Sequence, residues 1–123
     1  MPPVIHLMIC KFKDETLPAS QIDNICQRTL ALRTDCIHPS TGQPYIKSIQ
    51  GGTDQSVQGQ NKEMTHAFII EFESEEDRTY FLKEDPVHVK HAGEFVPMIN
   101  SKDGDFVGLT LDFVPGKFET KGV

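Results

Sequence analysis

The sequence predicts one α+β domain, built on a ferredoxin-like, antiparallel four-stranded sheet with its helices on one face. Its 123 residues fall within the usual size of a single domain. Strand-like and helix-like segments alternate along the chain in the order strand, helix, strand, strand, helices, strand, which is typical of that fold. We therefore expect a single domain over residues 1–123, with its core at about 4–114.

The expected strands are apolar on both faces. Segments 4–12, 64–72 and 106–114 carry the clearest alternation, and 45–50 is a shorter strand. In the first segment His6 and Met8 alternate with Ile5 and Leu7, whereas a strand with one wet face would alternate apolar with polar residues. Three helices cannot cover both faces of four strands, so we expect a symmetric homodimer to cover the second face.

Capping patterns predict where the helices begin. The expected caps are Ser20 with Asp23, Ser74 with Asp77, and Asp85 with Pro86. The first helix is expected to end near Arg33. On the third helix His88 shares a face with Ala92 and Phe95, so His88 should point toward the core.

Charge and composition exclude several classes of partner. The net charge of -6 disfavours nucleic acid, which needs clustered Lys and Arg. Apolar stretches are far shorter than the roughly 20 residues that cross a bilayer, and the N-terminal segment has no basic leader, so we expect a cytoplasmic protein without membrane contact. The three cysteines are odd in number and lack C-x-x-C spacing, which indicates buried free thiols.

His88 is a candidate general base. It lies near the third residue of its helix, where the helix dipole disfavours imidazolium and leaves a neutral imidazole. An aspartate on the other ring nitrogen would hold the tautomer and stabilise the charge after proton transfer. Such a pair supplies about 100-fold to 10,000-fold in rate. The alternative is that a core histidine and a strand aspartate satisfy each other for stability.

The other histidines allow further interpretations. His6 and His66 lie on apolar strand faces and are either hydrogen-bonded structural residues or pocket residues. A metal site would combine His88 and His91 with His6 or His66, but the motif H-E-x-x-H is absent, so we expect no metal. Cys10 is expected to pack rather than to act as a nucleophile, since no cationic neighbour is evident.

Three segments of the chain resemble the stress-responsive α/β-barrel domain family, whose members form dimeric α+β barrels. They are IHLMICKFKDET, THAFIIEFESEEDRTYFLKEDPVHVKHAGEFVPMI and LDFVPGK. The most specific pieces are Thr65-His66, Phe72-Glu73-Ser74 and Asp85-Pro86-Val87-His88. The family includes a plant polyketide cyclase, olivetolic acid cyclase, which closes a ring by aldol condensation without a cofactor. It also includes many members with no assigned activity.

The resemblance implies a site. His88 and Asp112 occupy the positions of the proton-transfer pair of the cyclases, and His6 and His66 match the pocket-lining histidines. The cyclases carry a tyrosine shortly before the Pro-x-His turn, whereas the nearest phenol here is Tyr80, two residues further back. The expected substrate-binding residues are His6, His66, Tyr80 and Phe68.

The sequence thus favours a cofactor-independent enzyme that acts on a small, partly apolar carbonyl compound, such as a polyketide intermediate. Proton abstraction next to the carbonyl would lead to cyclisation or an aldol-type step. A noncatalytic ligand-binding or stress-response protein with the same pocket is an alternative, and a cofactor-free oxygenase is another.

Overall fold

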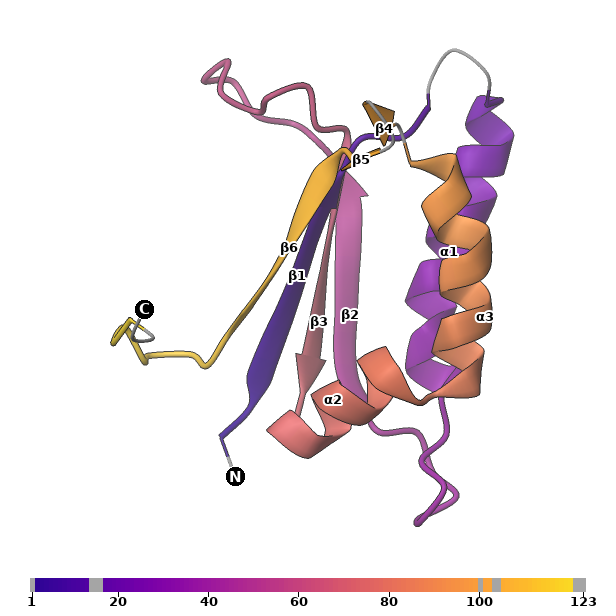
Figure 1. Ribbon diagram of the computed structural model, residues 1–123, viewed down its shortest axis with the longest axis vertical. Helices are drawn as coiled ribbons and strands as arrows, with labels where there is room; N and C mark the ends of the chain where they lie inside the picture. Colours follow the sequence, from indigo (N-terminus) through magenta and orange to yellow (C-terminus); the bar gives the residue numbers. More distant parts are fainter. Residues whose placement is uncertain (1, 14–16, 100, 103–104, 121–123) are drawn as a thin grey trace.

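The structure is a computed structural model that describes residues 2–13, 17–99, 101–102 and 105–120. Its elements, shown in Figure 1, are β1 (Val4–Cys10), α1 (Ala19–Asp35), β2 (Ile46–Thr53), β3 (His66–Phe72), α2 (Glu75–Lys83), α3 (Pro86–Phe95), the 3-10 helix η1 (Val96–Met98), β4 (Ser101–Lys102), β5 (Asp105–Phe106) and β6 (Gly108–Phe113). Strands β4 and β5 pair only with each other. The other four strands form the main sheet.

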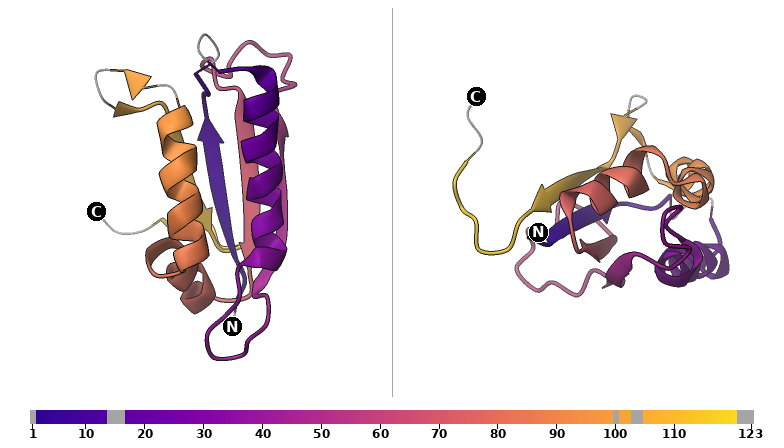
Figure 2. Two further views of the ribbon diagram at one scale, coloured as in Figure 1. Left: turned by 90° about the vertical axis from the view of Figure 1, so that its right-hand side faces the viewer. Right: turned by 90° about the horizontal axis from the view of Figure 1, so that it is seen from below.

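The main sheet has the strand order β2-β3-β1-β6, and every neighbouring pair is antiparallel. Helices α1 and α3 lie side by side over one face, and α2 crosses the same face at the lower end of the sheet in Figure 1. Figure 2 shows the same two layers from the helix side and from below. The predicted ferredoxin-like α+β fold is confirmed.

The helix-facing side of the sheet carries the core. Because side chains alternate along a strand, every second residue of β1 and β3 points at the helices. At the end of the sheet near the N-terminus of α1, the buried cluster is Cys10, Phe12, Ile25, Phe68, Phe95, Met98 and Ile99. At the opposite end it is Leu32, Cys36, Ile46, Ile70, Phe72 and Phe81.

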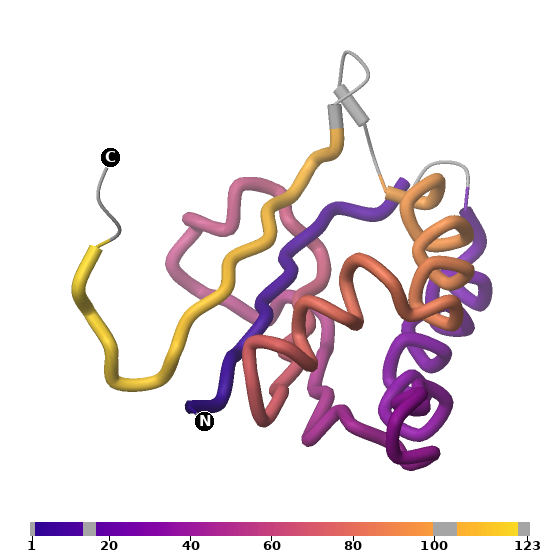
Figure 3. Tube along the Cα trace, turned by 60° about the horizontal axis from the view of Figure 1, so that its bottom comes forward, coloured from indigo at the N-terminus to yellow at the C-terminus, as the bar shows by residue number. Residues whose placement is uncertain are grey.

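The other face of the sheet is apolar but uncovered in the part of the chain that the structure describes. Its large side chains remain exposed, among them Ile69 at 42%, Leu109 at 51%, Leu111 at 56% and Phe113 at 46%. Figure 1 shows no helix on this side, and Figure 3 shows the segment after β6 running away from the sheet. The structure therefore has the doubly apolar sheet that the strand patterns predicted.

Two of the three predicted helix caps are confirmed. Ser74 accepts a hydrogen bond from the backbone N–H of Asp77 at 3.1 Å, and Asp85 accepts one from Val87 at 2.9 Å. The Ser20 cap is wrong: α1 already begins at Ala19, after Pro18, and no side chain caps it. Proline supplies a fixed φ of −61° at that position, so the helix can start without a capping hydroxyl.

Candidate active site

A cavity of about 290 Å³ lies between the helices and the sheet. Three of the five histidines of the chain line it, together with mostly apolar side chains. The lining residues are His6, Met8, Thr29, Leu32, Ile70, Phe81, Leu82, His88, His91, Ala92, Phe95, Val96, Phe106 and Thr110. Hollows of about 460 and 520 Å³ near the β2–β3 loop and near His38 hold one histidine each. We therefore place the candidate site in the three-histidine cavity.

His6, which lines this cavity, pairs with Asp112. They face each other directly in the antiparallel register of β1 and β6, on the helix-facing side. The His6 Nδ1 atom lies 2.6 Å from Asp112 Oδ1, and His6 is only 8% exposed. The N–H at Nδ1 donates to the carboxylate, so Nε2 is the ring nitrogen left for a substrate. This is the arrangement of a histidine base with an orienting carboxylate.

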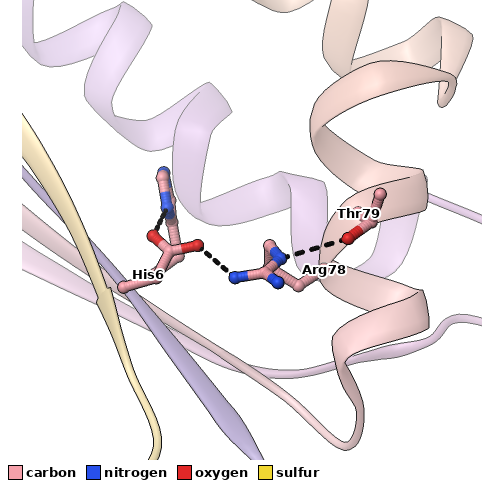
Figure 4. A network of polar contacts seen from close by, with 4 residues as sticks. His6, Arg78 and Thr79 are labelled. Atoms are coloured by element: carbon pink, nitrogen blue, oxygen red, sulfur yellow. Dashed lines mark hydrogen bonds and ion pairs between the residues drawn. The ribbon is translucent and has the colours of Figure 1, made fainter. Parts of the chain in front are cut away.

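Arg78 of α2 completes the network (Figure 4). Its Nη1 atom donates to Asp112 Oδ2 over 2.6 Å, and its Nε donates to the hydroxyl of Thr79 over 3.3 Å. Both carboxylate oxygens of Asp112 are thus bound, one by His6 and one by Arg78. Sequence reasoning missed Arg78, although it stands three residues before the buried Phe81 and so belongs to the inward side of its helix.

His88 does not bind Asp112, in contrast to the pairing that the sequence suggested. Its ring lies over Phe81, with the two centroids 4.0 Å apart. Its Nδ1 atom is buried and has no hydrogen-bond partner among the described residues. Burial lowers the pKa of His88 from the usual 6.5, and the nearby backbone of Phe81 raises it by a smaller amount. The ring is therefore neutral. The reason for the different pairing is the strand register, which places His6 opposite Asp112.

His91 is the third histidine of the cavity, and it is 8% exposed. Its Nε2 atom lies 2.8 Å from the hydroxyl of Thr29 on α1. Burial, followed by the charge of Arg28 and the nearby His88, lowers the pKa of His91 to about 4. From the sequence, His91 was expected only as a possible metal ligand. A histidine one turn after His88 on an inward helix face was the signal for a second pocket residue.

His66 and Phe68 do not line this cavity, although both point to the helix-facing side. His66 pairs with Cys10 at the far end of β1, whereas His6 pairs with Ile70. Four residues along a strand correspond to about 13 Å. The ring of His66 packs on Phe12 at 4.7 Å, and burial lowers its pKa. The structure therefore separates His66 from the other two predicted histidines.

Tyr80 also lies outside the cavity. Its ring packs on His38 at 5.3 Å and on Tyr45 at 5.6 Å. The hydroxyl of Tyr45 donates to the buried Asp85 at 2.5 Å, which ties this aromatic group to the cap of α3. Tyr80 directly precedes Phe81, and one residue turns a helix by about 100°, so its phenol faces a different side of α2.

A cysteine and a metal site were the other candidates for chemistry. Cys10 is buried, and burial together with Cys26 raises its pKa to about 12, so its thiol stays protonated at neutral pH. Within the described ranges no group of three or more His, Cys, Asp or Glu residues could hold a metal ion. No helix in that part of the chain is long and apolar enough to cross a membrane.

The family model of the stress-responsive A/B barrel domain matches residues 4–103. The chain belongs to this family. The expectation drawn from the sequence segments is thereby confirmed. A comparison with curated proteins found no match.

Solved structures of the same fold cover nearly the whole chain. A hydroxynitrile lyase from Passiflora edulis aligns with a TM-score of 0.78 and 23% identity, over 97% of this chain and 98% of the lyase. A dimeric ferredoxin-like protein of unknown function from Thermobifida fusca has a TM-score of 0.66 and 16% identity, over 92% and 91%. SnoaB, a cofactor-independent oxygenase from Streptomyces nogalater, aligns as a mutant with a TM-score of 0.61 and 11% identity, over 98% and 100%.

Proposed function

We propose that this member of the stress-responsive A/B barrel family is a cofactor-independent enzyme that abstracts a proton from a small, partly apolar carbonyl compound, such as a polyketide intermediate. Cyclisation or an aldol-type step would follow. The observation that carries the proposal is the 2.6 Å contact between His6 Nδ1 and Asp112 Oδ1 at the wall of the cavity. The enzymes that share the fold, a hydroxynitrile lyase and an oxygenase, support an enzymatic role.

In the proposed reaction His6 is the base. Asp112 accepts the Nδ1 proton, so the lone pair of Nε2 takes the proton next to the substrate carbonyl. The substrate becomes an enolate, and the carboxylate of Asp112 stabilises the imidazolium that forms. Arg78 holds the second carboxylate oxygen and keeps Asp112 in place. The imidazolium then returns its proton to the product oxygen or carbon.

His88 serves as the second polar group of the proposed site. A buried nitrogen without a partner costs about 1–3 kcal/mol, and Nδ1 of His88 is such a nitrogen. The ring of His88 lines the cavity, so it would contact a bound substrate, although Nδ1 itself is buried. His88 and Asp112 thus both keep a role in the chemistry, while His6 replaces His88 as the partner of the carboxylate.

The size and lining of the cavity indicate the kind of substrate. Its volume of about 290 Å³ lies at the lower end of the range for small-molecule sites. Apolar side chains such as Met8, Leu32 and Ile70 surround the histidines. These walls favour a compact, largely apolar molecule.

Exchange of the benzylic protons of phenylacetone in deuterated water, followed by proton NMR, tests proton abstraction directly. His6→Gln and Asp112→Asn should each slow the enzyme-dependent exchange by about 100-fold or more. His66→Gln is the matched control, because it replaces a histidine on the same sheet face outside the cavity, and it should leave the rate unchanged. Undiminished exchange by His6→Gln would contradict the proposed base.

Two further results of this assay separate the alternatives. Wild-type protein that binds phenylacetone without accelerating exchange would be a noncatalytic ligand-binding protein. If His88→Gln loses activity as completely as His6→Gln, both histidines act in proton transfer, whereas a smaller loss assigns His88 to substrate positioning. The fold change at each position is read as a loss of transition-state stabilisation.

The homodimer remains part of the proposal. The exposed residues Ile69, Leu109, Leu111 and Phe113 form an apolar sheet face, and the related protein from Thermobifida fusca is described as dimeric. A second copy would bury this face in an interface that resembles a domain core. Light scattering of wild-type protein should give about twice the mass of 13.8 kDa. Leu111→Asp should abolish the dimer or make the protein insoluble, whereas Phe118→Asp, at a residue 92% exposed beyond the sheet, should not.

A further inference from the structure

The hydroxyl of Thr29 determines which nitrogen of His91 carries a proton. This hydroxyl has a single hydrogen, and it donates to the backbone carbonyl of Ile25, one turn earlier in α1, over 2.9 Å. With that hydrogen on the carbonyl, the hydroxyl oxygen accepts from His91 Nε2 at 2.8 Å. The arrangement thus favours the tautomer with the proton on Nε2.

His91 is also uncharged under physiological conditions. Its side chain is packed between α1 and the sheet, and its pKa is lowered to about 4 by burial, Arg28 and His88. Arg28 in turn forms an ion pair with Glu94. With the proton on Nε2 and no second proton, Nδ1 carries a lone pair. That nitrogen makes no hydrogen bond to any residue in the described ranges.

We infer that His91 is a fixed hydrogen-bond acceptor in the three-histidine cavity, and that the ligand of this cavity carries a hydroxyl or N–H group that meets it. The inference deepens the proposed function, because it adds a required donor group to the carbonyl compound. A hydroxylated or enolic carbonyl compound fits both His6 and His91. A methyl ether or a second ketone at the same place would bring an oxygen lone pair of the ligand against the lone pair of His91 Nδ1. Such a ligand would bind more weakly.

Two small aromatic probes test the required donor. Phenol donates a hydrogen bond, whereas anisole has the same ring and oxygen but cannot donate. Their dissociation constants are measured by NMR titration of wild-type protein and of His91→Phe, which keeps an aromatic ring of similar size. We expect the ratio of the anisole constant to the phenol constant to be about three- to tenfold higher in wild type than in His91→Phe. The same ratio in both proteins, or binding of neither probe to wild type, would overturn the inference.

Variants of Thr29 test the tautomer. In Thr29→Val the ring loses its acceptor, so the proton can move to Nδ1, and the preference for phenol should fall to that of His91→Phe. Thr29→Ser retains the hydroxyl and should retain the preference. The ¹⁵N shifts of the His91 ring report the tautomer without any ligand, and we expect the proton on Nε2 in wild type and in Thr29→Ser. A proton on Nδ1 in wild type would overturn the assignment.

The outcome is independent of the catalytic proposal. Probe preference and ring shifts are binding and structural measurements, so they stand even when phenylacetone shows no exchange. Conversely, exchange that depends on His6 together with an equal affinity for phenol and anisole would support the base and reject the acceptor role of His91. The two proposals thus fail by different observations.

Discussion

Replacement of Arg78 by Met tests how much the network around Asp112 depends on its cation. The substitution keeps the aliphatic part of the side chain but removes the guanidinium that binds Asp112 Oδ2 at 2.6 Å. The side chains of Arg78 and Asp112 are 22% and 25% exposed, so water can reach the freed oxygen in part. Asp112 keeps its hydrogen bond to His6, and the fold should remain intact.

The expected cost follows from this geometry. Hydrogen bonds to charged groups contribute about 1.5–3 kcal/mol, and partial exposure reduces that to about 1–2 kcal/mol. For a domain of this size the melting temperature should fall by about 3–8 °C. Since Asp112 then loses one of its two anchors, the rate of phenylacetone exchange should also fall, by about tenfold. Arg78→Lys should recover part of both losses, because it restores the charge without the planar fork.

Thermal unfolding by circular dichroism and the exchange assay measure both effects on one sample. Arg33→Met is the matched control: Arg33 is exposed and donates only to the backbone carbonyl of Lys47, so its loss should change stability by less than about 0.5 kcal/mol. If Arg78→Met melts and exchanges like wild type, the contact between Arg78 and Asp112 contributes nothing and the network reduces to the His6–Asp112 pair.

Two further predictions concern stability. Because the pKa of His91 is about 4 in the folded protein against 6.5 as its ordinary value, the unfolded chain binds more protons between those values. The free energy of unfolding should therefore fall by about 3 kcal/mol as the pH drops from 6.5 to 4. In urea unfolding of His91→Phe, the free energy of unfolding should depend less on pH over this range. An unchanged pH dependence in this variant would contradict the assignment. Gly51→Ala should destabilise by about 1–3 kcal/mol, because a Cβ there would lie 2.4 Å from the Phe68 ring. Gly52→Ala, with open space, is its control, and equal stability of the two variants would refute the packing argument.

The elements of the fold were largely predictable because they depend on near neighbours in the sequence. Alternation in 4–12 and 64–72 indicated strands with two apolar faces, and the patterns at Ser74 and Asp85 marked two helix starts correctly. Two residues are exceptions. Phe106, expected in the last strand, pairs in β5 with Ser101 of β4. Phe12, expected in the first, forms only an isolated bridge to Ile99.

The polar residues of the cavity were only partly predictable. The sequence indicated that His88 points toward the core and that His6 and His66 lie on apolar strand faces, and the family resemblance added Asp112. Neither could show which of these residues meet, since a strand face extends over the whole length of the sheet. His6 and His66 share one face, yet they lie at opposite ends of the paired strands β1 and β3.

Local sequence patterns thus determined which residues of this protein share a strand or helix face, because alternation and helical periodicity act over a few residues. The tertiary structure decided the partners. His6 and Asp112 are 106 residues apart in the chain, and only the register between β1 and β6 sets them opposite each other. The packing of α2 against the sheet brings Arg78 to the same carboxylate, and the packing of α1 against α3 brings Thr29 to His91. Contacts between distant segments depend on register and packing angle, which no short stretch of sequence encodes.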